Sequence, residues 1–232
     1  MVIGGIIKAC NKINRKDSNI PSMNEEKKTF SDLLRLWFKW VTDPLGAFFN
    51  QLGIRPNTMT ILGVMGTTIG AFMVAQGNML WGGLFILISV PFDALDGTMA
   101  RLRGEANEWG AFVDSVADRY SELITYAGLL YFYLFTSPNN FACILVFISA
   151  SGSVLVSYVK ARADSLALYA KGGLLTRVER YIILAPALVV NQPLIALWIL
   201  AILTNVTAFQ RIYIARKDAY RKHFINNGVK HA

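Results

Sequence analysis

The sequence predicts an all-α integral membrane protein with six transmembrane helices, preceded by an amphipathic helix at the membrane interface. Of its 232 residues, 54% are hydrophobic and only 16% are charged, whereas soluble domains carry about 25% charged residues. A helix needs about 20 mostly apolar residues to cross a bilayer. The fifth apolar run is short, so we expect it to extend back through the polar residues before it. The six runs are 57–76, 79–101, 110–136, 140–162, 178–191 and 193–214.

The segment before the first apolar run has the pattern of an amphipathic helix. In TFSDLLRLWFKWV the apolar residues recur at helical spacing, and charged residues occupy the other side. Trp37 and Trp40 suit the headgroup level, where an aromatic ring keeps one end in water. We expect this helix within 28–53, with Pro44 breaking it. Residues 1–27 show no periodicity and are expected to be weakly ordered or surface-bound.

Basic residues predict the orientation in the membrane. The connections QGN, TSPNN and NQ contain no Lys or Arg, whereas the opposite ends of the apolar runs and both termini are basic. The protein is therefore expected to be a multi-pass protein of the cell membrane, and the positive-inside rule places both of its termini in the cytoplasm. The net charge of +8 then faces anionic lipid headgroups, and we expect no nucleic-acid partner. The transmembrane domain is expected over 54–216, followed by a basic cytoplasmic tail over 217–232.

Four aspartates interrupt the apolar pattern in DALDGTMARLRGEANEWGAFVDSVAD. Asp93 and Asp96 are spaced i, i+3, and Asp114 and Asp118 are spaced i, i+4, so each pair projects from one face of its helix. The short connection over 102–109 makes the two helices antiparallel neighbours, and the pairs can face each other near the cytoplasmic end. A single Asp at the centre of a span costs about 2.5–3.5 kcal/mol on insertion scales. Something positive is therefore expected between them.

Divalent metal ions would neutralise these carboxylates. Oxygen ligands without Cys or His point to two hard ions, either Mg²⁺ or Mn²⁺. Gly97 and Gly110 let a backbone or ligand approach their helices closely. Arg101 adds a fixed cation, which makes sense if an anionic substrate with a pyrophosphate joins the metals. The alternative for such residues is the acidic midplane site of a cation transporter or channel.

Further basic residues lie at or inside the later apolar runs. Arg180 lies at the start of the fifth run and Arg211 near the end of the sixth. A guanidinium inside a span needs a partner, and a phosphate on a substrate would supply one. Lys160 and Arg177 are expected at the same cytoplasmic end of the helical bundle. Lys217, by contrast, flanks the last span and is expected to serve topology alone.

The aspartate pattern resembles the signature of a known family, the CDP-alcohol phosphotransferases. That signature is D-x2-D-G-x2-A-R-x8-G-x3-D-x3-D, and the chain matches every fixed position of it. The resemblance implies an enzyme that transfers the phosphatidyl group of CDP-diacylglycerol to an alcohol with release of CMP. It also implies that Asp93, Asp96 and Asp114 hold metal, and that Asp118 holds metal and acts as general base.

The same resemblance implies the residues that contact the CDP-linked lipid. Gly97 and Arg101 belong to the signature itself and contact the CDP moiety in the family. Asn57 and Thr60, from RPNTMT, and Asn107 in the connection between the aspartate pairs are nucleotide contacts by the same resemblance.

The later basic stretches resemble the branch of the family that makes phosphatidylinositol phosphate. The resemblance implies that Lys160, Arg180 and Arg211 form the pocket for the phosphate of inositol phosphate, and Arg177 lies one turn before Arg180. Glycerol 3-phosphate as acceptor and CDP-archaeol as donor stay open as alternatives. Family members of this type are commonly homodimers, so a homodimer is expected.

Overall fold

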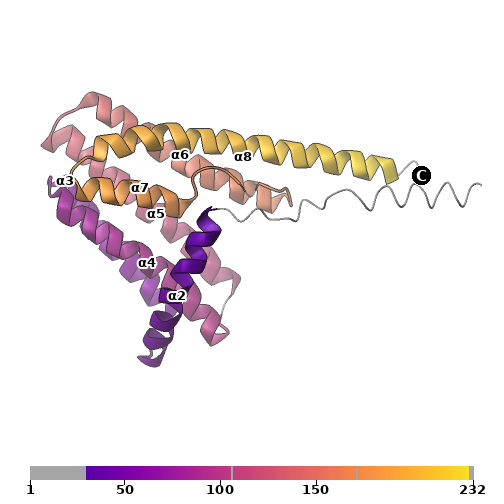
Figure 1. Cartoon of the computed structure of the whole chain (residues 1–232), viewed down its shortest axis with the longest axis horizontal. Helices are drawn as coiled ribbons and strands as arrows, with labels where there is room; N and C mark the ends of the chain where they lie inside the picture. Colours follow the sequence, from indigo (N-terminus) through magenta and orange to yellow (C-terminus); the bar gives the residue numbers. More distant parts are fainter. Residues whose placement is uncertain (1–29, 106, 171, 230–232) are drawn as a thin grey trace, which may run out of the picture.

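The computed structural model describes the backbone of residues 30–105, 107–170 and 172–229, and it is built of helices joined by short connections (Figure 1). Side chains are described for residues 40, 42–92, 95–105, 107–170 and 172–223. The expectation for residues 1–27 lies outside these ranges. The helices are α2 (Phe30–Gln51), α3 (Pro56–Ala75), α4 (Met79–Arg103), α5 (Glu108–Tyr131), the π-helical turn η1 (Phe132–Thr136), α6 (Asn140–Ser165), α7 (Arg177–Val189) and α8 (Pro193–Val229).

Four of these helices are long and apolar enough to cross a membrane: α3, α4, α6 and α8. Helix α5 has 24 residues but carries several charged side chains, and α7 has only 13 residues, or about 20 Å at about 1.5 Å per residue. The all-helical fold predicted from the sequence is therefore confirmed among the described residues, and the four long apolar helices indicate a membrane protein. The crossing of the bilayer by α5 and α7 stays a prediction.

Two expectations about helix limits are wrong. Helix α7 does not extend back beyond Arg177, because Thr176 has an extended backbone and forms a capping box with Glu179. Helix α2 continues through Pro44, since a proline removes a single i to i−4 hydrogen bond and the turns on either side keep their own. The amphipathic face of α2 stays a prediction, because the side chains of 30–39, Trp37 among them, lie outside the described residues.

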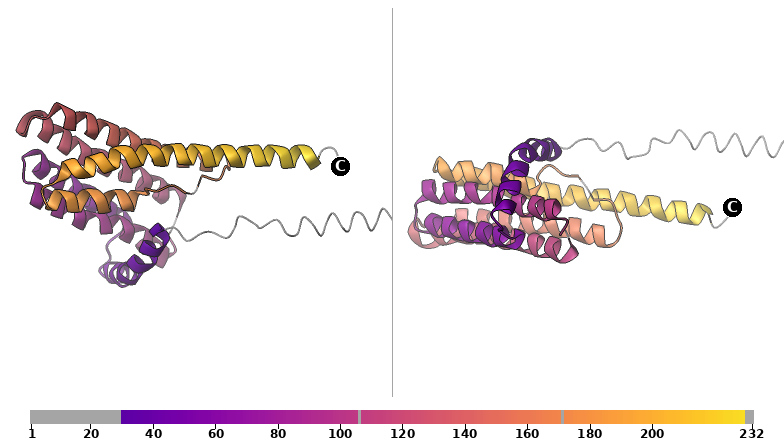
Figure 2. Two further views of the ribbon diagram at one scale, coloured as in Figure 1. Left: turned by 45° about the horizontal axis from the view of Figure 1, so that its top comes forward. Right: turned by 90° about the horizontal axis from the view of Figure 1, so that it is seen from below.

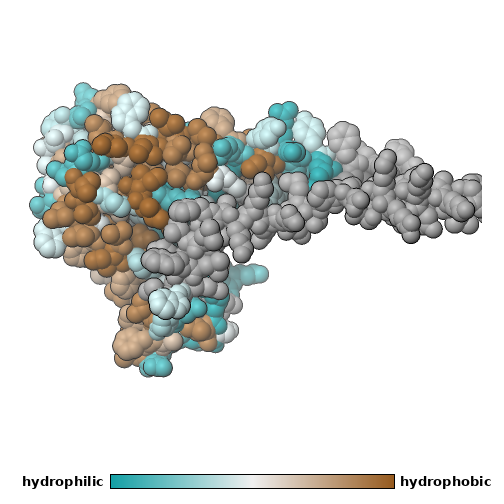
Figure 3. All heavy atoms as spheres, in the orientation of Figure 1, coloured by the Kyte–Doolittle hydropathy of each residue, from teal (hydrophilic) through white to brown (hydrophobic). Residues whose placement is uncertain are grey.

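Helices α3 to α8 form the bundle, and α2 crosses it at a steep angle (Figure 2). Helix α3 packs against both α4 and α5, α6 packs against α8, and α7 packs against α4 and α8. Helix α8 has 37 residues, and its C-terminal part projects beyond the other helices (Figure 1). Hydrophobic residues gather over the bundle, and the projecting part of α8 carries hydrophilic ones (Figure 3).

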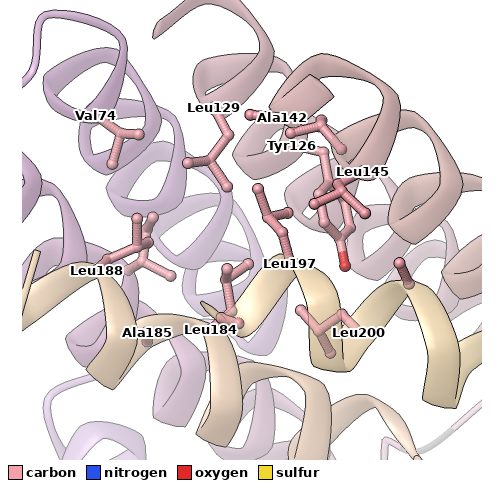
Figure 4. Close-up of a cluster of buried hydrophobic side chains, with 14 of the residues drawn as sticks. Val74, Tyr126, Leu129, Ala142, Leu145, Leu184, Ala185, Leu188, Leu197 and Leu200 are labelled. Carbon is pink, nitrogen blue, oxygen red and sulfur yellow. The ribbon is translucent and has the colours of Figure 1, made fainter. Parts of the chain in front are cut away.

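The core lies in the middle of the bundle and takes side chains from every helix from α3 to α8 (Figure 4). Leu188 of α7 and Leu197 and Leu200 of α8 are fully buried there, beside Leu129 of α5. Tyr126 of α5 is buried among them, and its hydroxyl shares a 3.2 Å hydrogen bond with Ser153 Oγ on α6. A buried polar group needs such a partner, so this bond also fixes α5 against α6.

Helices α3 and α5 approach each other closely at a glycine. A Cβ built on Gly128 would lie 2.4 Å from the carbonyl oxygen of Ala71. Because that oxygen belongs to the backbone, no rotation of a side chain can relieve the clash. Small residues allow such close approach between membrane helices. Because the hydrophobic effect does not drive helices together within lipid, van der Waals packing has to stabilise their contact.

Replacing Gly128 by Ala should therefore push α3 and α5 apart. We expect a loss of about 1–3 kcal/mol, the usual penalty of overpacking, measured as a lower thermal midpoint of the purified protein in detergent. Ala127→Leu is the matched control, because Ala127 is exposed on the same helix. An unchanged midpoint for Gly128→Ala would contradict this account of the α3–α5 contact.

Candidate active site

The four signature aspartates lie on α4 and α5, close to the connection between them. Asp93 and Asp96 lie in the second half of α4, and Asp114 and Asp118 lie in the first half of α5. Gly104 has a left-handed backbone, with φ 68°, and ends α4, after which the chain reverses. The antiparallel order of the two helices is as predicted. Helix α3, which packs on both, helps to set their spacing.

Asp96 is buried where α4 faces α3. It is 5% exposed, and its Oδ2 accepts a 2.5 Å hydrogen bond from Thr60 Oγ1 on α3. A hydroxyl in this position orients a carboxylate in the manner of outer-shell partners at metal sites. The resemblance gave Thr60 a nucleotide contact, but in this structure its hydroxyl serves Asp96.

The metal site itself stays a prediction. Among the described side chains, no group of three His, Cys, Asp or Glu residues lies close enough to hold an ion, and the side chain of Asp93 is not among them. The chemistry of the carboxylate ligands nevertheless fits a divalent metal ion. Carboxylate oxygens with a supporting hydroxyl suit Mg²⁺ or Mn²⁺, which prefer oxygen ligands.

The residues that the resemblance assigns to the CDP-linked lipid lie in the second half of α4, in the connection after it and in the first turns of α3. A Cβ on Gly97 would meet only the tip of Arg101 within 4 Å, at 3.7 Å, so that face of α4 is open among the described residues. Arg101 is exposed, and its Nη2 donates to Thr98 Oγ1 at 2.9 Å. Asn57 is exposed in the first turn of α3.

Asn107 has a structural task in this structure. It is the N-cap of α5, and its Oδ1 accepts a 2.7 Å hydrogen bond from the backbone N–H of Gly110. A capping residue satisfies an N–H that the first turn leaves without a helical partner. Asn107 and Gly110 therefore start the helix that carries Asp114 and Asp118.

Two ion pairs connect α5 to α7. Asp118 pairs with Arg177, the first residue of α7. One turn along, Glu122 pairs with Arg180 through two bonds, from Nε to Oε1 at 2.6 Å and from Nη2 to Oε2 at 3.0 Å. Arg180 is 2% exposed and Glu122 is 4% exposed. The base candidate and the acceptor-site candidates are thus brought together.

Arg211 also finds its partners inside the protein. It is 6% exposed, and it donates from Nε to the carbonyl oxygen of Gly172 at 2.9 Å and from Nη1 to that of Val156 at 2.7 Å. The partner that each guanidinium needs inside the bundle comes here from the protein, Glu122 for Arg180 and two backbone carbonyls for Arg211, and a phosphate as a further partner stays a prediction. Residues far apart in the sequence supply the partners. Lys160 lies half-buried one turn after Val156 on α6.

The segment between α6 and α7, which carries Gly172, is held by α8. The carboxylate of Asp218 accepts a 2.9 Å hydrogen bond from the backbone N–H of Tyr169 and pairs with Lys222 at 3.1 Å. Gly173 has φ 116°, and a Cβ there would lie 2.5 Å from Thr207 Cγ2 on α8. A glycine is therefore required at this point.

Glu122 and Asp218 are the acidic residues of this region that the sequence reasoning missed. A signal for Glu122 was present, because it follows Asp118 by four residues and so shares its helix face. Asp218 sits in a basic stretch, KDAYRK, and nothing local predicts its bond to a backbone 49 residues earlier.

The family model for CDP-alcohol phosphatidyltransferases matches residues 54–215, from the start of α3 into α8. This chain belongs to the CDP-alcohol phosphatidyltransferase family. It is therefore an enzyme of that class, and the transporter alternative is set aside. The matched region contains all the signature aspartates as well as Arg177, Arg180 and Arg211.

Relatives of this phosphatidyltransferase include the phosphatidylinositol phosphate synthase of Streptomyces avermitilis, which is 36% identical over an alignment of 209 residues; the alignment covers 83% of this chain and 85% of the relative. The crystal structure of the phosphatidylinositol phosphate synthase of Mycobacterium tuberculosis with CDP-DAG bound is similar, with a TM-score of 0.71 and 31% identity over 75% of this chain and 93% of that one. The same synthase in complex with manganese and citrate gives a TM-score of 0.70, with 31% identity, over 75% of this chain and 88% of that one.

Proposed function

We propose that this phosphatidyltransferase transfers the phosphatidyl group of CDP-diacylglycerol to inositol phosphate, giving phosphatidylinositol phosphate and CMP. The observation that carries the proposal is a cluster of three arginines on α7 and α8, the half-buried Arg177 and the buried Arg180 and Arg211. Arg177 pairs with Asp118 itself, and Arg180 and Arg211 extend from α7 and α8 into the protein interior. A phosphorylated alcohol held by such a cluster presents its hydroxyl near a carboxylate, as the reaction requires. The similarity to synthases of phosphatidylinositol phosphate supports the same acceptor.

In the proposed reaction the acceptor hydroxyl attacks the phosphorus that bears the diacylglycerol, the bond from that phosphorus to the bridging oxygen breaks, and CMP leaves. Asp118 takes the proton of the hydroxyl, a contribution of about 10²- to 10⁴-fold. Arg177 orients the Asp118 carboxylate through their ion pair. Positioning by the surrounding residues supplies most of the rest of the rate.

Asp93, Asp96, Asp114 and Asp118 would hold two ions of Mg²⁺, or Mn²⁺, whose chemistry is to stabilise the charge that builds on the leaving CMP. Thr60 holds the carboxylate of Asp96 in place for that task. The open face of α4 at Gly97, with Arg101 beside it, would receive the CDP moiety, and Asn57 lies at the nearby start of α3.

We further propose the arrangement in the membrane. Helices α5 and α7 cross together with the four apolar helices, so that six helices span and α2 lies at the interface. The positive-inside rule puts both termini and the active site in the cytoplasm. The protein acts as a homodimer in the cell membrane.

An acceptor screen tests the proposed function. Purified protein with CDP-diacylglycerol and Mg²⁺ should release CMP fastest with inositol phosphate. Free inositol should be a poor acceptor because it lacks the phosphate that the arginines are proposed to bind, and glycerol 3-phosphate should be intermediate or inactive because it does not fill a site sized for a six-membered ring. The proposal fails if unphosphorylated inositol or serine is the best acceptor.

Metal dependence tests the role of the aspartates. CMP release should vanish with a chelator and return with Mg²⁺ or Mn²⁺. Asp93→Asn, Asp96→Asn and Asp114→Asn should each abolish activity, because each removes a ligand charge at constant side-chain length. Asp118→Asn should lose turnover and keep substantial binding of the CDP-lipid. Asp43→Asn is the control, since Asp43 is exposed on α2. Full activity in any of the first three variants would contradict the metal site.

Arg211→Ala tests the acceptor site from α8. The KM for inositol phosphate should rise by about 10- to 100-fold, because a lost charged hydrogen bond is worth about 1.5–3 kcal/mol. The KM for CDP-diacylglycerol should stay nearly unchanged. Lys217→Ala is the matched control, an exposed cation on the same helix, and it should do little. If Arg211→Ala raised the KM values for both substrates alike, the assignment of Arg211 to the acceptor site would be wrong.

A further inference from the structure

The two ion pairs between α5 and α7 bridge helices that pack mainly on other neighbours. Helix α5 packs on α3 and α6, and α7 packs on α4 and α8. Two long arginine side chains of α7 therefore reach across to α5. The i, i+4 spacing of Asp118 and Glu122 matches the i, i+3 spacing of Arg177 and Arg180, so each carboxylate receives its own arginine.

The second pair fixes the orientation of a guanidinium. Glu122 engages Nε and Nη2 of Arg180 side by side, at 2.6 and 3.0 Å. A guanidinium has five N–H groups in a rigid plane, and this bidentate pair uses two of them. The edge that carries Nη1 consequently points away from Glu122, in a direction that the pair determines.

The surroundings of the pair keep Glu122 dedicated to Arg180. Thr125, Tyr126, Tyr181 and Leu184 line the same small pocket as Glu122 and Arg180. The Tyr126 hydroxyl is engaged by Ser153. Arg119, the other cation that faces Glu122, lies farther away, at 4.0 Å from Oε2. Because the pair is neutral as a whole, its attraction for an anion must come from directed N–H groups more than from net charge.

We propose that Glu122 is a positioning residue, which aims Arg180 at the phosphate of the acceptor and thereby makes the enzyme selective for a phosphorylated alcohol. This inference rests on the proposed function. Glu122 contacts neither substrate and acts through Arg180. It also prevents Arg180 from pairing with Asp118, which lies one helical turn earlier on α5. Asp118 is the carboxylate that takes the proton of the acceptor.

Positioning and simple electrostatics predict opposite signs for Glu122→Gln. Loss of a negative charge beside the arginines would tighten the binding of any anion if charge alone governed it. If Glu122 aims Arg180, the same change leaves the guanidinium without its bidentate partner, and acceptor binding weakens. The direction of the change in acceptor KM therefore decides between the two.

The experiment measures kcat and both KM values by CMP release for wild type, Glu122→Gln, Arg180→Gln and the double variant. Glu122→Gln should raise the KM for inositol phosphate about 10- to 100-fold and change the KM for CDP-diacylglycerol by less than about twofold. The double variant should be no worse than Arg180→Gln alone, because coupled residues are not additive. Glu108→Gln, an exposed acid on the same helix, should match wild type.

A second variant covers the case in which Glu122→Gln does not fold, since removal of one partner from a buried pair is strongly destabilising. Glu122→Asp keeps the charge and shortens the side chain by one methylene, so the pair stays neutral but loses its bidentate geometry. It should raise the acceptor KM about 3- to 10-fold. A normal or lowered acceptor KM in either Glu122 variant, or additivity with Arg180→Gln, would overturn the inference.

Wild-type kinetics separate this inference from the proposed function. If the wild type prefers another phosphorylated alcohol, the proposed acceptor is wrong, and the Glu122 variants test positioning with that alcohol instead. If the wild type uses inositol phosphate and the Glu122 variants bind it normally, only the positioning role fails. A wild type that prefers an unphosphorylated alcohol refutes both.

Discussion

Every charge inside this apolar helical bundle has to be paired, and that constraint organises the end of the molecule that carries the site. A buried charge without a partner is far more costly than any single contact can offset. Asp96 therefore has the hydroxyl of Thr60, Glu122 has the guanidinium of Arg180, and Arg211 has two backbone carbonyls. Each of these contacts joins different parts of the chain, so the groups proposed for catalysis also hold the helices together.

Close helix packing positions these charged groups. Gly70 of α3 and Gly82 of α4 face each other so closely that a Cβ on either would lie within 2.8 Å of the other's carbonyl oxygen, and Gly128 of α5 approaches Ala71 of α3 in the same way. Helix α3 is thereby fixed against both helices that carry the aspartates, and it brings Thr60 to Asp96. Apolar packing and the polar site thus depend on the same small residues.

Helix α8 has two tasks. Its 37 residues measure about 55 Å at about 1.5 Å per residue, which is far longer than a bilayer requires. The first part packs in the core through Leu197 and Leu200, and the later part carries Asp218, which binds the segment between α6 and α7. Since that segment supplies Gly172 to Arg211, the projecting end of α8 contributes to the arginine cluster from outside the core.

The sequence by itself determined the helices and the signature, because hydropathy and residue spacing are properties of short stretches of chain. It predicted four membrane-spanning runs closely, and it placed Asp93, Asp96, Asp114 and Asp118 on two consecutive antiparallel helices. Only the tertiary structure decided the partners. Arg180 meets a glutamate 58 residues earlier, and Arg211 meets a carbonyl 55 residues earlier, since pairing across helices depends on how the helices rotate and pack against one another, which spacing within a single helix does not encode.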